Sequence, residues 1–274
     1  MRITRGGPGA IATLNNRGGL PPNRYALASD GVDDVITLAN ESTFGFERTD
    51  AFSVELWIRT TDATGFVIVK GVRESTTYHG WYFGMQIEGG NDGVTQFGLI
   101  NNYGTGDRLA VGATNAVHDG TWHHVAVTYD GSSLASGVTL YVDAVAETPI
   151  VATDNLSASV LTSDPVTIGA RLAPASFAGV AGDMDEIRIW DVERTAVQIA
   201  ASYKTRIDSA PGLVGAWNCE KLEVITSGAI ITNVGQAIGA TPSHRLADTS
   251  GGASHGTFTN FPNDPWVTVG SLPW

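Results

Sequence analysis

The sequence predicts an all-β protein built as a two-sheet antiparallel sandwich. The chain of 274 residues contains 33 glycines, only three methionines and 8% aromatic residues, a composition typical of short strands joined by tight turns. Residues 52–59 alternate apolar and polar side chains, as a half-buried strand does. Asp-Gly dipeptides favour hairpin turns. They recur between apolar segments, at Asp30-Gly31, Asp92-Gly93, Asp119-Gly120 and Asp130-Gly131.

The first strand that the pattern defines clearly is 52–59. Phe52, Val54, Leu56 and Ile58 are expected to face the core, whereas Trp57 falls on the polar side, which indicates that this second face is also covered. Further strands are predicted at 65–70, 80–87, 94–101, 121–129, 137–143, 165–169 and 184–190.

One helix is predicted, from Thr195 to Tyr203. Thr195 and Gln198 have the spacing of a capping box. Three apolar residues of this segment are expected to face inward: Val197, Ile199 and Ala200.

Charge is distributed unevenly along the chain. The net charge is −12, yet residues 1–24 contain no acidic residue. They carry Arg2, Arg5, Arg17 and Arg24. The remaining 12 basic and 28 acidic residues give the body a charge of −16, which argues against nucleic acid as its partner because phosphate would be repelled. A basic extended arm suits docking on another acidic surface, including a sister subunit; a solvated, disordered arm is the alternative.

From the sequence we expect neither membrane insertion nor export by the general secretory route. No apolar run approaches the roughly 18 residues of a membrane span, and residues 1–24 lack the apolar segment of a secretory signal. Cys219, the single cysteine, has no internal disulfide partner. A chain of this length buries enough surface to fold without disulfide or metal.

Five segments, in order, carry a family resemblance. They are Tyr25–Leu38, Phe52–Arg59, the hairpin Asp119–Gly131 with Leu140–Asp143, Val166–Gly169, and Phe177–Trp190 with the short helix after it. This series resembles the laminin-G-like, or concanavalin-A-like, lectin domains over residues 25–207. The resemblance implies a jelly-roll sandwich and a non-catalytic role.

The resemblance also suggests a division of the chain into three parts: the arm 1–24, a laminin-G-like sandwich 25–210 and a C-terminal segment 211–274. Within the last part, Gly212–Trp217 and Ala247–Phe258 are similar to a strand and loop that relatives carry before the opening strands, and Val224–Ala240 is an apolar insertion. We expect this segment to complete the sandwich or to form an assembly contact; the start of a truncated second domain is the alternative.

A calcium site is one prediction for this fold. Asp30, Asp33 and Asp34 crowd one turn, and in the resembling jelly rolls that turn can lie beside the closing strand, which here carries Asp185. Hard oxygen ligands of this kind suit Ca²⁺. The alternative is that Asp30 and Asp33 cap the turn through their own backbone.

A glycan site is predicted from aromatic and amide side chains near turns. The candidates are Tyr78, Trp81, Asn101, Asn102 and Tyr103. Aromatic faces stack on sugar rings because both have an apolar face. Packing in the core is the alternative for Trp81, so that Tyr78 and Tyr103 are the preferred candidates.

Three catalytic or metal patterns are discounted. His123 and His124 are adjacent on a strand, so they point to opposite faces and cannot chelate one ion; a buried, hydrogen-bonded His123 is expected. Residues 252–256 match G-x-S-x-G, but no strand precedes and no helix follows them. Asp183 and Asp185 share a strand face, although Ile187 interrupts the series expected of a glycosidase.

Two classes of function remain. The first is a non-catalytic structural or decoration subunit of a large assembly, such as a phage capsid, tail or fibre, located on the virion surface after assembly in the host cytoplasm. The second is a free glycan-binding, lectin-like adhesion module that reaches the outside by a non-classical route. A glycoside hydrolase of the same fold is a third, less favoured class.

Overall fold

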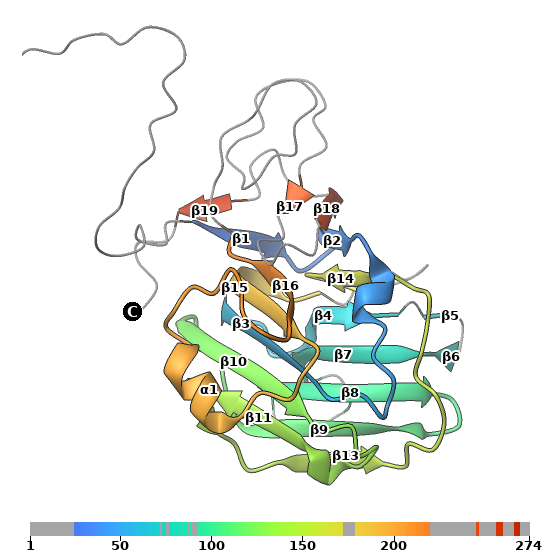
Figure 1. The fold of residues 1–274 in the computed structure, drawn as a ribbon. Coiled ribbons are helices and arrows are strands. Elements are labelled where there is room, and N and C mark those ends of the chain that lie inside the picture. The colour runs from blue at the N-terminus through green and yellow to red at the C-terminus, as the bar shows by residue number, and fades with distance from the viewer. Residues whose placement is uncertain are drawn as a thin grey trace, which may run out of the picture.

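The structure, a computed structural model, shows two antiparallel sheets that face each other across one apolar core (Figure 1). This confirms the predicted jelly-roll sandwich. The described residues are 25–71, 73–74, 77–86, 88, 92–171, 179–219, 245–246, 256–259 and 266–268. The predicted basic arm (residues 1–24) and the apolar insertion (residues 224–240) lie outside them.

The first sheet, here called sheet A, has eight described strands. Its order is β12 (Val145–Ala146), β11 (Val138–Val142), β10 (Trp122–Tyr129), β3 (Phe52–Thr60), β15 (Ala181–Trp190), β1 (Tyr25–Asp30) and β19 (Trp266–Thr268), with β16 (Leu213–Trp217) also paired to β15. Two 3₁₀ turns, η1 (Glu41–Phe44) and η2 (Ala135–Gly137), lie in the connections.

The second sheet, sheet B, has nine described strands. Its order is β13 (Ile150–Asp154), β9 (Asp107–Ala116), β8 (Val94–Asn102), β7 (Gly80–Met85), β4 (Gly65–Lys70), β14 (Val166–Ile168), β2 (Val35–Leu38), β18 (Gly256–Thr259) and β17 (Arg245–Leu246). A separate hairpin joins β5 (Arg73–Glu74) to β6 (Thr77–Tyr78). Each strand predicted from the sequence is present, with ends shifted by a few residues.

Segments from the two ends of the described chain lie side by side. In sheet A, β19 pairs with β1, so that Leu27 is opposite Trp266. In sheet B, β18 pairs with β2, so that Ile36 is opposite Phe258. Figure 1 shows β19 and β18 along the two strands that open the fold. Residues 211–274 therefore contribute strands to both sheets.

Strand β3 shows how sequence alternation builds the core. Phe52, Val54, Leu56 and Ile58 are fully buried between the sheets, as predicted. They are joined there by apolar side chains from the facing strands of sheet B, among them Trp81. Burying such side chains is the main stabilising contribution in a sandwich of this kind.

The opposite face of β3 holds a buried group of charges. Glu55 is fully buried, and its Oε1 accepts hydrogen bonds from Arg194 Nη1 at 2.7 Å and from Trp190 Nε1 at 3.0 Å. Arg188 Nη1 lies 3.5 Å from the same oxygen, and His124 Nε2 lies 3.3 Å from Oε2. The outer face of sheet A is therefore covered, as the position of Trp57 indicated.

The cover is the helix α1 (Ala196–Ser202) and the turn that follows it. Thr195 and Gln198 form the predicted capping box. Ile199 packs on β10 and β11 (Figure 1). The expectation that Val197 and Ala200 face inward is wrong: Val197 is 77% exposed and Ala200 is also exposed. A helix of two turns resting on a sheet has only one narrow contact side.

Within the described residues, no helix has the length and apolar character needed to cross a lipid bilayer.

Trp122, in the hairpin that carries the family resemblance, is half-buried. It begins β10 opposite Arg59 of β3, and the Arg59 guanidinium lies 5.2 Å from the centre of its ring. The ring is half-buried beside this cation on the outer face of sheet A, the face that Ala126 of the same strand turns toward α1.

Candidate functional site

The candidate site lies on the outer face of sheet B, the face that points away from the core. The strand register places a set of small residues next to one another on this face across β7, β8 and β9: Gly84, Gly98, Ala110 and Gly112. Of these four residues, Gly112 lines a pocket of about 210 Å³.

Two of these glycines have a packing reason to be glycine. At Gly98 an added Cβ would lie 2.3 Å from Tyr82 Cε1, because the tyrosine ring covers that position. At Gly84 it would lie 2.6 Å from the carbonyl oxygen of Gly65. Any larger residue at either position would displace its neighbours.

Gly112 has no such reason. An added Cβ would meet its nearest neighbour, Thr95 O, only at 3.8 Å, and Gly112 is not among the residues with a positive φ. Glycine inside a strand costs about 0.5–1 kcal/mol relative to alanine. Packing and backbone conformation therefore do not explain this glycine, and what its missing side chain provides is open space above β9.

That open space is the pocket. Gly112 is in its wall together with Glu88, Val94, Gln96, Ile150 and Ala152. Gln96 Nε2 lies 3.9 Å from the position of a Gly112 Cβ, so an amide nitrogen borders the space directly. The pocket thus combines apolar walls with a few polar groups, the usual composition of a small-molecule site.

The polar groups of the pocket are held in fixed positions. Gln96 Oε1 accepts a hydrogen bond from the backbone N–H of Glu88 at 2.6 Å, and Glu88 Oε2 is bonded to Arg108 Nε at 2.6 Å. The hydroxyl of Tyr82 lies 3.3 Å from Glu88 Oε1. Burial, reinforced by Glu88, raises the pKa of Tyr82 well above its usual value of 10, so this hydroxyl stays neutral and donates its proton.

Arg108 connects the pocket to a predicted residue, Tyr103. The Arg108 guanidinium lies 4.4 Å from the centre of the Tyr103 ring, and Nη1 donates to the Tyr103 carbonyl at 3.2 Å. Burial works against the charge of Arg108, but Glu88 outweighs burial and raises the pKa of this guanidinium. Tyr103 is 46% exposed. Among the three predicted aromatic residues, Tyr103 is the exposed one.

The other residues predicted for glycan binding have different surroundings. Tyr78 is 3% exposed and Trp81 is 0% exposed. The expectation that Tyr78 offers a ring face to a sugar is therefore wrong, and Trp81 packs in the core, which was the alternative for this residue. The amide nitrogen of Asn101 donates to Ser159 O at 2.6 Å, and Asn102 Oδ1 accepts from Thr105 N at 3.2 Å. These two amides hold the turns at the end of β8.

Sequence reasoning missed Glu88, Gln96, Arg108 and Gly112. Their proximity arises from the register of β8 with β9, in which Gln96 is opposite Gly112 and Ile100 is opposite Arg108. The available signal was the recurrence of glycine on consecutive strands.

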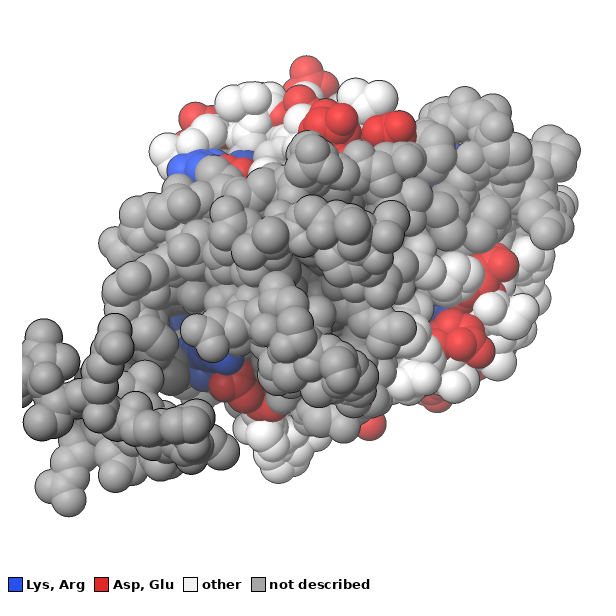
Figure 2. Space-filling view, turned by 90° about the horizontal axis from the view of Figure 1, so that it is seen from above, with Lys and Arg blue, Asp and Glu red and all other residues white. Residues whose placement is uncertain are grey.

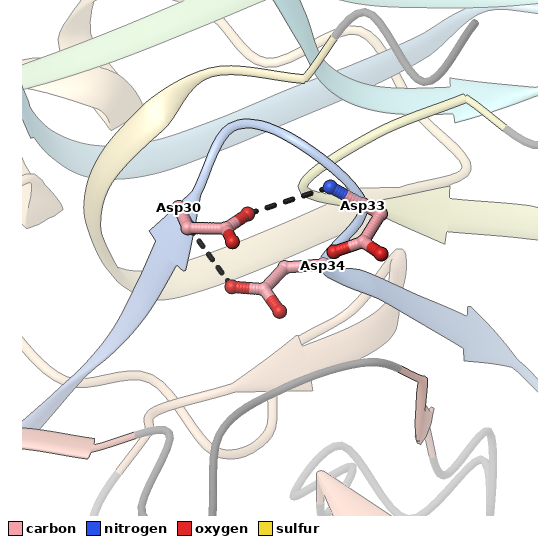
Figure 3. A group of neighbouring side chains, drawn as sticks. All are labelled: Asp30, Asp33 and Asp34. Atoms are coloured by element: carbon pink, nitrogen blue, oxygen red, sulfur yellow. Dashed lines mark hydrogen bonds between the residues drawn. The ribbon is translucent and has the colours of Figure 1, made fainter.

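The acidic turn between β1 and β2 is a second cluster (Figure 3). Asp30, Asp33 and Asp34 bring one carboxylate oxygen each within 4.8 Å of one another. Asp34 Oδ2 accepts from Asp30 N at 2.9 Å, whereas Asp34 Oδ1 is buried without a hydrogen-bond partner. Burial and the two neighbouring carboxylates raise the pKa of Asp34. An uncompensated buried oxygen among carboxylates fits the needs of a bound cation.

The predicted fourth ligand, Asp185, is not part of this turn. Ala181 is the residue of β15 opposite Asp30, and Asp185 lies beyond Met184, which is opposite Leu27. At about 3.3 Å per residue, Asp185 is more than 10 Å farther along the strand. The expectation that it joins the cluster is wrong. The alternative of turn capping is confirmed for Asp30, whose Oδ1 accepts from Val32 N at 2.8 Å.

The discounted residues are engaged in structural contacts. Asp183 Oδ2 accepts from Arg59 Nε at 2.8 Å, and Asp185 is fully buried, so these two carboxylates do not form an open pair. His124 is the buried histidine; His123 is instead partly exposed at the end of β10, with Nδ1 2.9 Å from Asp143 Oδ2. Residues 252–255 of the G-x-S-x-G match lie outside the described residues.

Comparisons with known proteins agree with this fold. The sequence model of Laminin_G_3, described as concanavalin A-like lectin/glucanases superfamily, matches residues 30–200. A comparison with curated proteins finds no match.

Two solved structures illustrate the similarity. A candidate carbohydrate-binding protein from Bacteroides ovatus ATCC 8483 has a TM-score of 0.59 and 17% identity, over 93% of this chain and 61% of that one. This chain therefore spans 61% of the length of that protein. The CBM40 of Ruminococcus gnavus IT-sialidase bound to α2,3-sialyllactose has a TM-score of 0.50 and 11% identity, over 66% of this chain and 98% of that one. At these identities the similarity shows the fold alone.

Proposed function

Because the chain belongs to the Laminin_G_3 family of the concanavalin A-like lectin/glucanases superfamily, we propose that it is a non-catalytic, lectin-like module and that the pocket at Gly112 is its glycan site. The observation that carries the proposal is the open space above Gly112, which neither packing nor backbone conformation explains. Carbohydrate binding by proteins of the same fold supports it.

The chemistry of the pocket suits a sugar ring. Such a ring has an apolar C–H face and a rim of hydroxyl groups. Ile150 and Ala152 offer apolar contact, while the Gln96 amide and the Glu88 carboxylate offer a donor and an acceptor at the border. Both polar groups are already oriented by hydrogen bonds, which lowers the entropy lost on binding.

Filling the pocket should abolish binding without unfolding the protein. We expect Gly112→Leu to melt like the parent protein, because its Cβ has room, and to lose at least tenfold in affinity on a glycan array and in calorimetric titration of the best array ligand. Gly112→Ala, with a smaller side chain, should lose less. Ala116→Leu, at an exposed position of the same strand, is the matched control and should bind normally. Undiminished binding by Gly112→Leu would refute this site.

A second candidate function, an assembly subunit such as a phage virion component, rests on another surface. The edge strands of both sheets carry exposed apolar side chains: Val145 on β12, and Ile150 and Val151 on β13. Unpaired strand edges with apolar residues are ready sites for pairing with another chain. We propose that the basic arm of a neighbouring copy, residues 1–24, binds the acidic body at such an edge, and that the protein is then displayed on a virion surface.

Removal of the arm tests this second candidate. Deleting residues 1–24 is expected to leave the melting temperature unchanged and to convert an oligomer to monomers in sedimentation experiments. High salt should weaken the full-length assembly, because screening reduces the contacts of the arginines. A full-length protein that is monomeric at every concentration, or a truncated one that assembles normally, would contradict it.

We also propose that Asp30, Asp33 and Asp34 hold a calcium ion that ties β1 to β2. Calcium in excess over its dissociation constant should raise the melting temperature, since binding only to the native state adds about 2.7 kcal/mol at 100 times that constant. Asp33→Asn should remove the effect, and Asp92→Asn, at an exposed position, should keep it. Identical melting curves of the parent protein in calcium and in chelator would leave only the turn-capping role.

A further inference from the structure

We infer, on the basis of the proposed function, that the pocket at Gly112 selects uncharged sugars and excludes sialylated ones. The inference comes from the charges that surround the pocket. The described wall residues include one carboxylate, Glu88, and no cation. The carboxylate of a sialic acid placed there would lack the cationic partner that recognition of such a group normally uses.

Arg108 is the cation bonded to this wall, and its Nε and Nη1 already bond protein groups. Its Nε is bonded to Glu88 Oε2, its Nη1 to the Tyr103 carbonyl, and its plane stacks on the Tyr103 ring. Turning Arg108 Nε toward an anion would break its pair with Glu88, whose side chain is only 3% exposed. A nearly buried carboxylate left without its partner is strongly unfavourable.

The wider surface adds repulsion in the same direction. Glu147 lies beside the next part of β9, where its Oε2 accepts from the backbone N–H groups of Thr114 and Asn115. Thr114 is two residues, or about 7 Å, from Gly112, which is within the Debye length of about 8 Å at physiological ionic strength. The chain as a whole carries a charge of −12. Figure 2 shows the other end of the sandwich, away from β9 and β13, and there too the described Asp and Glu side chains are more widespread than Lys and Arg.

The fold itself accommodates either kind of sugar. The Ruminococcus gnavus CBM40 is bound to α2,3-sialyllactose and has a similar fold. The choice between neutral and acidic glycans therefore depends on the side chains around the pocket and not on the sandwich.

Paired probes test the inference. Neutral oligosaccharides on an array, including lactose, are compared with the same oligosaccharides carrying a terminal α2,3-linked sialic acid. We expect the parent protein to bind at least one neutral member at least tenfold more tightly than its sialylated counterpart, and Gly112→Leu to lose that binding.

A charge introduced into the wall should shift the preference. Ile150 is part of the wall and 36% exposed, so a lysine there can reach the pocket while leaving the core intact. Ile150→Lys is expected to raise the ratio of sialylated to neutral binding at least fivefold at low salt, and less at high salt. Ile150→Gln, of similar length and no charge, should leave the ratio near that of the parent protein.

The outcomes separate the two levels of the proposal. Equal or tighter binding of the sialylated members, lost in Gly112→Leu, overturns the selectivity and keeps the glycan site. Binding that Gly112→Leu does not reduce, or binding to no glycan at all, overturns the proposed function and this inference with it.

Discussion

Replacing Glu55 by glutamine is expected to lower the free energy of unfolding by about 3–5 kcal/mol. Glu55 is fully buried and balances two buried guanidinium groups, those of Arg188 and Arg194. The neutral amide removes the carboxylate that pairs with Arg194 and leaves Arg188 with Glu186 alone, whose Oε2 lies 2.7 Å from Arg188 Nη2. These arginines also bond to the carbonyls of Gln198 and Thr205, so the loss should first release α1 and the turn after it from sheet A.

The pH dependence of stability provides an independent measurement. Burial alone would raise the pKa of Glu55, but His124, Arg188 and Arg194 outweigh it and lower the pKa from 4.5 to about 2. A lowered pKa means that the unfolded chain binds the proton more tightly. The contribution of ionised Glu55 to the free energy of unfolding is therefore complete above about pH 4.5 and is lost as the pH falls toward 2. A pKa shift of this size corresponds to roughly 3 kcal/mol.

Urea denaturation between pH 2 and pH 7 distinguishes this group from others. The parent protein should lose stability in acid more steeply than Glu55→Gln, and the two curves should converge near pH 2. Glu193→Gln, at an exposed position, is the matched control and should change stability by less than about 0.5 kcal/mol. If Glu55→Gln were as stable as the parent protein at pH 7, the buried charges would have to be balanced by other groups.

The second large effect is expected at Trp81. Trp81→Ala should cost about 3–5 kcal/mol, because it removes a fully buried ring from the middle of the core. The ring lies 5.6 Å from that of Phe52, and its Nε1 donates to Phe44 O at 3.2 Å. Chemical denaturation with unchanged slope would measure the loss.

Trp122→Ala provides the comparison. The same substitution at this half-buried ring is expected to cost only about 1–2 kcal/mol, because the contact with Arg59 lies at the end of the sandwich. Equal losses at Trp81 and Trp122 would contradict the different burial of the two rings.

The sequence predicted the sandwich well because strand alternation is a local signal. The alternation within residues 52–59 is enough to place four apolar side chains on one face: Phe52, Val54, Leu56 and Ile58. The capping box of α1 is equally local. Burial of the outer faces depends on segments that are distant in sequence. For this reason the position of Tyr78 near a turn gave the wrong expectation of exposure, and the burial of Glu55 was not predicted.

The candidate pocket was missed for a related reason. Strand β9 was not predicted, because its outward positions hold Arg108, Ala110 and Gly112, which give a weak contrast with the apolar positions between them. Gly112 comes to line the pocket only when β8, β9 and β13 are aligned. The same applies to Asp185, whose distance from the acidic turn depends on the register of β1 with β15.

The pairing of β1 with β19 and of β2 with β18 has a consequence for the order of synthesis. The ribosome releases β1 and β2 early, yet the edges that β19 and β18 cover remain open until residues 256–268 emerge. Domains generally fold as they leave the ribosome, so most of the sandwich can form before β18 and β19 are made. During this time the uncovered edges of β1 and β2 can pair with a strand of another nascent chain. Translation of β18 and β19 is therefore the step that covers these two edges, and chains that stop before it should depend on chaperones to stay apart.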